Sequence, residues 1–201
     1  MSAFPFVYLA SQSPRRQALL DQIGVAYQVL LPSDPEAAEA LEAVLPQESA
    51  LRYVKRVTRL KVQAAMQQMH QQSLPFAPVL CADTTVVVDG QILGKPANAR
   101  QATDMLRLLS GKAHQVLTAV AIGHNQDIQL ALSRSRVKFA PMTAADIQDY
   151  VASEEPMGKA GAYAIQGRAS AFISHVSGSY SGIMGLPLYE TTLLLKQIGA
   201  V

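Results

Sequence analysis

The stretch FVYLASQSPRRQALLDQIG, residues 6–24, decides how the chain begins to fold. Its apolar start at residues 6–10 predicts a short buried strand, and residues 14–23 predict an amphipathic helix. Ser13 stands where a helix N-cap is expected. Pro14 suits the first helical position, because its missing N–H would have no partner there. The chain therefore opens with a strand, a polar turn and a helix.

The rest of the chain continues with strands and helices, without an internal repeat or a long linker. They alternate at first and then give way to antiparallel pairs, which predicts an α/β fold with a mixed, twisted sheet flanked by helices. We expect a single domain over residues 1–201. Further strands are expected at 25–31, 79–89, 115–122 and 128–139, and further helices at 48–70, 98–109, 143–153 and 186–199.

The sequence also predicts the structure of three connections between these elements. Residues 32–48 are acidic, rich in alanine and broken by prolines, which predicts a loop with room for one helical turn. Asp89-Gly90 predicts a hairpin turn after the strand that precedes it. The residues around Ser177-Gly178 predict a second hairpin.

Composition and charge favour a protein that acts on a small ligand. The net charge of +2 is too small for nucleic-acid binding by bulk electrostatics. A single cysteine, Cys81, excludes an intramolecular disulfide and a multi-cysteine zinc site, which favours a reducing compartment. No stretch approaches the ~18 apolar residues of a membrane span, and the N-terminal segment lacks a secretory pattern. We therefore expect a cytoplasmic protein without nucleic-acid or membrane partners.

Hydroxyl and guanidinium groups gather at the start of the first predicted helix. A helix N-terminus exposes unpaired N–H groups and carries partial positive charge, so it attracts anions such as a triphosphate. The alternative is that the serine at the cap only closes the helix while the arginines are solvated or pair with the acidic connection. Neither a Walker loop nor a Gly-x-Gly-x-x-Gly fingerprint occurs. The candidate ligand-binding residues here are Ser11, Ser13, Arg15 and Arg16.

A carboxylate interrupts the apolar strand expected at 79–89. An unpaired buried charge is costly, so Asp83 requires a metal, a lysine or an arginine, or else becomes a candidate base. The alternative is an aspartate that caps a bend. Lys95 follows the next hairpin and is able to return to the same end of the sheet. Lys61 ends a basic run that begins at Arg52, and such a run is expected to be a solvated helix face.

Two further polar residues are candidate ligand contacts, and each also has an ordinary structural explanation. Glu36 lies in the acidic connection, where it is either exposed to solvent or placed near a metal. Gln166 stands beside a glycine, and its amide suits either a base edge or a loop backbone. The four histidines show no metal-ligand spacing, and no Gly-x-Ser-x-Gly elbow indicates acyl transfer.

Five short motifs occur in one order along nearly the whole chain. They are Leu9-Ala-Ser-Gln-Ser-Pro-Arg-Arg16, Ala82-Asp-Thr84, Gly94-Lys-Pro96, Ala160-Gly-Ala-Tyr-Ala-Ile-Gln-Gly167 and Gly185-Leu-Pro187. Each is weakly specific alone, but together they resemble the Maf family. The resemblance implies a mixed α/β fold like that of the inosine triphosphate pyrophosphatases, elongated and two-lobed around a central cleft. It also implies a homodimer in the cytoplasm.

The resemblance implies an activity as well, namely hydrolysis of a nucleoside triphosphate to the monophosphate and pyrophosphate. Asp83 corresponds to the proton acceptor, and Glu36 and Asp83 would serve a divalent metal. Oxygen ligands suit Mg²⁺ or Mn²⁺ better than zinc. The remaining roles fall to Ser11, Arg15 and Arg16, which would hold phosphate, and to Lys61 and Lys95, which would neutralise it.

The same motifs bear on substrate. The Gln166 loop and Asp83-Thr84 resemble the branch that acts on dTTP and UTP, with Arg15, Thr84 and Gln166 as specificity candidates. The branch that acts on 7-methyl-GTP typically has a tryptophan before the paired arginines, where this chain has Pro14. That branch is the nearer alternative. A more distant one is a regulator of septum formation that binds nucleotide or nucleic acid through the basic run without turnover.

Overall fold

A computed structural model describes residues 3–201 of the protein; Met1 and Ser2, the first two residues of the expected domain, lie outside this part. One mixed sheet of seven strands forms the centre of the molecule. The strands are β1 (Val7–Leu9), β2 (Tyr27–Val29), β3 (Val79–Val88), β4 (Gln91–Leu93), β5 (Ala113–His124), β6 (Asp127–Phe139) and β7 (Ile173–Ser177). Their order is β2-β1-β3-β5-β6-β7, with β4 paired to β3 beside this path. The predicted mixed α/β fold is therefore confirmed.

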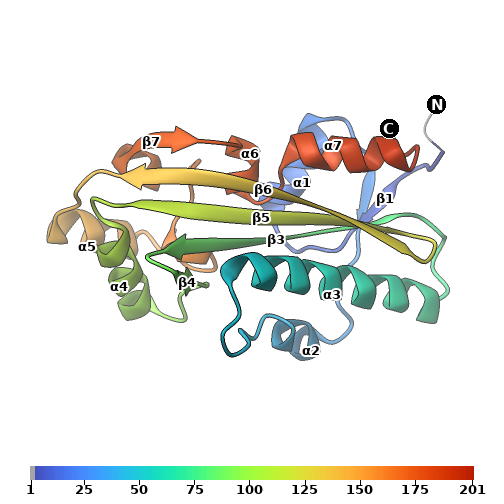
Figure 1. The fold of residues 1–201 in the computed structure, drawn as a ribbon, viewed down its shortest axis with the longest axis horizontal. Helices are drawn as coiled ribbons and strands as arrows, with labels where there is room; N and C mark the ends of the chain where they lie inside the picture. Colours follow the sequence, from blue (N-terminus) through green and yellow to red (C-terminus); the bar gives the residue numbers. More distant parts are fainter. Residues whose placement is uncertain (1–2) are drawn as a thin grey trace.

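Helices flank this sheet, and the molecule is elongated along β3, β5 and β6 (Figure 1). The α-helices are α1 (Pro14–Gln22), α2 (Pro35–Ala40), α3 (Ala50–Gln71), α4 (Ala99–Leu109), α5 (Ala144–Ala152), α6 (Tyr180–Met184) and α7 (Leu188–Gln197). Two short 3₁₀ turns, η1 (Ala160–Ala162) and η2 (Arg168–Phe172), precede β7. Among residues 3–201, no helix has the length and apolarity needed to cross a membrane.

The strand alternation sorts the buried side chains onto two faces of the sheet. In β3, Leu80 and Ala82 pack with α1 and α7, whereas Val79 and Cys81 pack under α3. This follows from the period of two along a strand. Farther along β3, Val86 joins a separate cluster with α4 and α5. The core is thus divided along the length of the sheet.

Helix α3 runs beneath the long strands and presents one apolar side to them (Figure 1). Its N-cap is Ser49, whose hydroxyl accepts from the Arg52 amide. Val57 and Ala65 on this side are buried, and Lys61 lies between them at helical spacing. The expectation that Lys61 belongs to a solvated face is therefore wrong, since its side chain is only 19% exposed.

The hairpin predicted around Ser177-Gly178 is wrong. Strand β7 pairs with β6, and the chain then enters helix α6 instead of a second strand. Gly178 has a φ of 107°, which turns the chain. Ser179 then caps α6 by accepting from the Gly182 amide, and its own amide donates to Ser135 Oγ on β6. These bonds give the Ser179 and Gly182 amides partners without a second strand.

Two details near the cavity described below also differ from expectation. The helical turn allowed for in the acidic connection is extended to a helix of six residues, α2, which Asp34 caps by accepting from the Ala37 amide. Ser13 occupies the N-cap position of α1 but makes no side-chain cap bond. Instead, the Ser13 amide donates to Ser11 Oγ at 3.1 Å. The hairpin predicted at Asp89-Gly90 is confirmed by the β3–β4 pairing.

Candidate active site

A cavity of about 620 Å³ opens beside the central strand β3. This volume lies within the usual range for small-molecule sites. Its lining draws on every one of the five motifs found in the sequence. Of the predicted site residues, those that line it are Ser11, Ser13, Arg15, Arg16, Lys61, Asp83, Thr84, Lys95 and Gln166.

The pairing of β3 explains why the cavity lies here. Strand β1 pairs with β3 at Val79 and Leu80, and β4 pairs with it from Val86 onward. In the described part of the chain, this edge of β3 has no partner strand between those two points, apart from the bond from the Ala10 amide to the Leu80 carbonyl. Asp83 and Thr84 lie in this gap. Both side chains therefore reach the cavity, although neighbours on a strand point to opposite faces.

The turn between β1 and α1 forms one side of the cavity. Ser11 Oγ accepts from the Ser13 amide and from Arg16 Nη1, each at 3.1 Å. Arg16 Nε donates to the Gly185 carbonyl at 2.8 Å, and Arg15 Nε donates to the Met184 carbonyl at 3.3 Å. The turn before α7 thus fixes both guanidinium groups, and N–H groups that these bonds do not use are available to a ligand.

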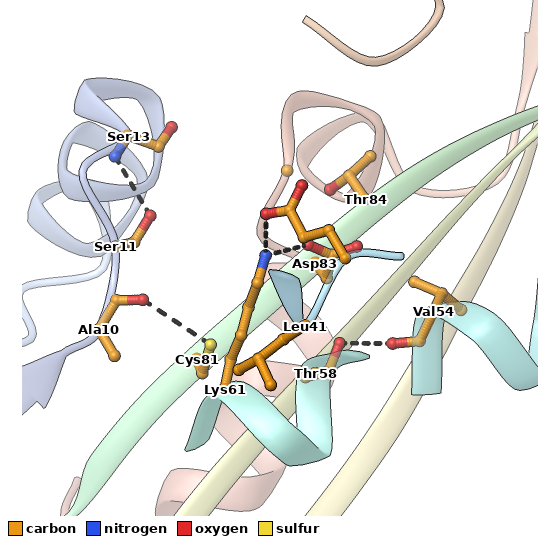
Figure 2. A network of polar contacts seen from close by, with 12 residues as sticks. Ala10, Ser11, Ser13, Leu41, Val54, Thr58, Lys61, Cys81, Asp83 and Thr84 are labelled. Carbon is orange, nitrogen blue, oxygen red and sulfur yellow. Dashed lines mark hydrogen bonds and ion pairs between the residues drawn. The ribbon is translucent and has the colours of Figure 1, made fainter. Parts of the chain in front are cut away.

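Four charged residues form an ion-paired cluster in the cavity. Lys61 Nζ lies 2.7 Å from Asp83 Oδ1 and 2.5 Å from Glu42 Oε1. Lys95 Nζ contacts Glu42 Oε2 at 3.2 Å. Figure 2 shows the Lys61 side chain rising from α3 to meet Asp83 on β3. We call Glu42, Lys61, Asp83 and Lys95 the ion-paired cluster.

Within this cluster, Lys61 and Glu42 stabilise each other's charged forms. Burial by itself lowers the pKa of Lys61, but the charges of Asp83 and Glu42 outweigh it and raise the pKa above its usual value. Burial raises the pKa of Glu42, yet the combined pull of Lys61 and Lys95 leaves it below its usual value. Asp83 is only 8% exposed. Asp83 is thus a buried carboxylate held against the Lys61 ammonium.

Three other cations line the same cavity, and none of them forms an ion pair within residues 3–201. Burial and the charge of Arg16 lower the pKa of Arg15. Burial and the charge of Arg15 lower the pKa of Lys159, although the charge of Glu155 acts in the opposite direction. We call Arg15, Arg16 and Lys159 the cation cluster. Like charges held together without a carboxylate in direct contact favour binding of an anion.

The segment that carries Gln166 closes the cavity from a third side. The Gly161 amide donates to the Gly94 carbonyl at 3.0 Å, and an added Cβ at Gly161 would meet Val86 within 2.9 Å. Gly161 also has a φ of 68°, which favours glycine. The segment is therefore held close to β3. Gln166 at its far end is exposed, and its amide is free to meet a ligand.

Thr84 lies beneath the turn that holds the arginines. Its Oγ1 lies 3.1 Å from Thr118 Oγ1 on β5, and Thr118 donates to the Gly182 carbonyl at 2.7 Å. A Cβ built on Gly185 would come within 3.6 Å of Thr84 Oγ1 and 3.5 Å of Arg16 Nε. The threonine, the arginine and the glycine thus converge on one corner of the cavity.

Glu36 does not lie where the metal hypothesis placed it. It is exposed in the first turn of α2 and is absent from the cavity lining. Glu42 reaches the cavity instead, because it follows the end of that helix and turns toward Lys61. The sequence contains several acidic residues in this connection, and nothing local distinguishes Glu42. Lys159 was also missed, since a loop lysine carries no signal of its own.

The carboxylates offer an incomplete metal site. Within residues 3–201, no group of three or more histidine, cysteine, aspartate or glutamate side chains is arranged to hold a metal. Asp83 and Glu42 nevertheless contact the same ammonium and so lie close together. Mg²⁺ is commonly held by one or two carboxylates together with phosphate oxygens and water. These two residues fit that pattern.

The basic run on α3 does not form one continuous surface. Arg56 binds Glu48 with Nε–Oε1 at 2.7 Å, and Lys61 belongs to the ion-paired cluster. Arg52, Lys55 and Arg59 remain exposed. The arrangement offers fewer free cations to a nucleic acid than the sequence suggested.

Fold and cavity together define an α/β protein that binds a polyanionic small ligand beside one buried carboxylate. The family model described as Maf-like protein matches residues 6–198 of the chain. The chain belongs to the Maf family.

Curated relatives extend over nearly the whole chain. A dTTP/UTP pyrophosphatase from Polaromonas sp. (strain JS666) is 64% identical over 199 residues, which cover 99% of this chain and 98% of that protein. A dTTP/UTP pyrophosphatase from Albidiferax ferrireducens is 59% identical and covers 96% of this chain and 97% of its own length. A third from Cupriavidus pinatubonensis is 56% identical over 96% of each chain.

Proposed function

We propose that this protein hydrolyses dTTP and UTP to the monophosphate and pyrophosphate. One observation carries the proposal: a single cavity holds both a cation cluster without carboxylate partners and a buried carboxylate paired to a lysine. The first suits a triphosphate and the second suits activation of water. The names of the relatives support the same substrates.

The N-terminal turn of α1 holds the phosphates in this proposal. The Ser11 and Ser13 hydroxyls and the Arg16 guanidinium lie at the positive end of the helix. Lys61 and Lys95 add positive charge from α3 and from the segment after β4. Charge that develops on the attacking and leaving oxygens is stabilised by such fixed cations.

Asp83 performs the proton step. Lys61 contacts Oδ1, so Oδ2 is the oxygen that accepts a proton from water. The water oxygen then bonds to the α-phosphorus, while the bond from that phosphorus to the bridging oxygen breaks. Pyrophosphate leaves with the bonding electrons. Lys61 holds Asp83 in place through Oδ1 and stays within reach of the developing negative charge.

We propose Mg²⁺ or Mn²⁺ as the metal, held by Asp83 and Glu42, with Glu42 in place of Glu36. When bound, the metal would neutralise phosphate oxygens and lower the pKa of water. A Glu42→Gln variant tests this role through its dependence on metal concentration. If Glu42 holds the metal, the variant needs more Mg²⁺ for half-maximal rate, while Glu36→Gln, the matched control, does not.

Base recognition falls to Arg15, Thr84 and Gln166 in this proposal, and Gln166 offers the clearest test. A pyrimidine edge presents donors and acceptors that a primary amide matches. Gln166→Ala should change the preference among nucleoside triphosphates roughly fivefold, as expected for one lost hydrogen bond. Inhibition by pyrophosphate, which has no base, should stay unchanged.

We further propose that the protein acts in the cytoplasm as a homodimer, without nucleic-acid or membrane partners. The dimer is implied by the family resemblance. Sedimentation equilibrium on the purified chain would test it, and a mass of one chain at all concentrations would contradict it.

Pyrophosphate release from a panel of nucleotides with Mg²⁺ or Mn²⁺ tests the activity itself. The panel should include dTTP, UTP, dCTP, dGTP and 7-methyl-GTP. Release confined mainly to dTTP and UTP supports the proposal. Preference for 7-methyl-GTP would assign the protein to the branch that acts on that nucleotide. Absence of release from every nucleotide would contradict the proposal that the protein is a pyrophosphatase.

A further inference from the structure

Lys159 reaches the cavity from the segment that also carries Gln166. It directly precedes η1, and it lines the cavity together with Arg15. Its ammonium donates to the backbone carbonyls of Glu155 and Met157. An ammonium has three N–H groups, so these two bonds leave one for a ligand.

The surroundings of Lys159 differ from those of the other cavity lysines. Lys61 and Lys95 each contact a carboxylate, whereas no carboxylate within residues 3–201 forms an ion pair with Lys159. Glu155 is close in sequence, but its carboxylate accepts from the Tyr150 hydroxyl at 2.8 Å and from the Arg168 amide at 3.0 Å. The charge of Glu155 raises the pKa of Lys159, but burial and the charge of Arg15 outweigh it and leave that pKa below its usual value. The Lys159 ammonium therefore shares the cavity with Arg15 and has no carboxylate in direct contact. Two half-buried cations that share a cavity are stabilised by an anion between them.

We propose that Lys159 is a further substrate-binding residue, which together with Arg15 holds phosphate oxygens of the nucleotide. The inference rests on the proposed function and adds to it a phosphate contact from the segment that carries Gln166. It places a cation at one end of this segment and an amide for the base at the other.

The side chain of Lys159 is not the main support of this segment. The Glu155 carboxylate ties the Arg168 end of the segment to Tyr150 on α5, and the Gly161 amide holds the middle to Gly94. A Cβ on Gly167 would lie within 2.3 Å of Glu155 Oε1, so that carboxylate fills the space beside the glycine. Replacing Lys159 should therefore leave the fold intact.

The test measures binding of inorganic pyrophosphate, which carries phosphate oxygens and no base, at a fixed Mg²⁺ concentration. Lys159→Gln should weaken binding roughly tenfold or more, because a charge-assisted hydrogen bond is lost. Lys159→Arg should recover most of it. Lys112→Gln is the matched control, because Lys112 is exposed and pairs with Asp89 at 2.8 Å outside the cavity. Binding of uridine, which has no phosphate, should be unchanged in all variants.

Two results would overturn the inference: unchanged pyrophosphate binding in a folded Lys159→Gln protein, or a loss confined to uridine. If the variant fails to fold, lysine acetylation of the wild-type protein provides the answer. Pyrophosphate should slow labelling of Lys159 and leave Lys112 unaffected, and equal labelling with and without pyrophosphate would contradict it. Failure of the proposed function would give a different result. The wild-type protein would then release no pyrophosphate from nucleotides, even if Lys159 binds added pyrophosphate.

Discussion

The ion-paired cluster and the cation cluster line one cavity but differ in how their charges are balanced. Lys61 has carboxylates at 2.7 and 2.5 Å, whereas the hydrogen bonds of Arg15 and Lys159 within residues 3–201 go to backbone carbonyls. In the first arrangement the carboxylates of the protein balance the lysine charges, so it fixes these side chains in place. The second is complete only when an anion binds. The difference separates the residues that perform chemistry from those that hold the substrate.

The largest effect should come from removing the base in the ion-paired cluster. Asp83→Asn keeps the shape of the side chain but cannot take a proton from water. We expect kcat to fall roughly a hundredfold to ten-thousandfold, with a smaller change in KM. Asp104→Asn, at an exposed site on α4, is the control and should retain full activity. A kcat near that of the wild type for Asp83→Asn would assign the base elsewhere.

The next largest effect should be a loss of stability when Lys61 is removed from the ion-paired cluster. Lys61→Met preserves length and leaves Asp83 and Glu42 without their shared cation. Breaking one partner of a buried ion pair should cost about 3 kcal/mol in the free energy of unfolding, measured by urea denaturation. Lys112→Met breaks an exposed pair with Asp89 and should cost under about 1 kcal/mol. Equal costs for the two variants would show that the ion-paired cluster is as weak as a surface pair.

A change in the cation cluster should alter substrate binding more than the rate of the chemical step. Arg16→Lys keeps the charge but loses the forked contact to Ser11 Oγ and the Gly185 carbonyl. We expect KM for dTTP to rise roughly tenfold while kcat changes less. Steady-state kinetics with Lys138→Arg on β6 as a control would measure this. A fall in kcat at unchanged KM would place Arg16 with the chemistry.

The smallest effect is a dependence of stability on pH. The folded pKa of Glu42 lies below its usual value of 4.5, so the stabilisation from this group is complete above 4.5 and is lost as the pH falls through the folded pKa. The difference in Tm between the wild type and Glu42→Gln should therefore be largest near neutral pH and shrink in acid. A constant difference at every pH would mean that the charge of Glu42 contributes nothing.

The sequence predicts those site residues whose role is visible from their immediate neighbours in the chain. Ser11 and Arg16 were predicted because a serine, a proline and two arginines at a helix start mark an anion site within a few residues. Asp83 was predicted because a carboxylate in an apolar strand needs a partner. That partner, Lys61, was misjudged from its own position, since only the packing of α3 on the sheet shows that it is buried.

The residues that the sequence missed depend on where distant segments meet. Glu42 reaches Lys61 because α2 forms and ends at Ala40, and this depends on the Asp34 cap. Glu36 has the same chemistry but stands in the first turn of α2, where it is exposed. The hairpin around Ser177-Gly178 failed for a similar reason. The serine that follows finds a bond to Ser135 on β6, and this favours a helix over a return strand.

The most direct test of the central claim is the fate of oxygen when dTTP is hydrolysed in water enriched in ¹⁸O. Water activated by Asp83 attacks the α-phosphorus in this account, so mass spectrometry should find the label in the monophosphate and none in the pyrophosphate. Label in the pyrophosphate would mean attack at the β-phosphorus and would contradict the placement of Asp83 beside the α-phosphate.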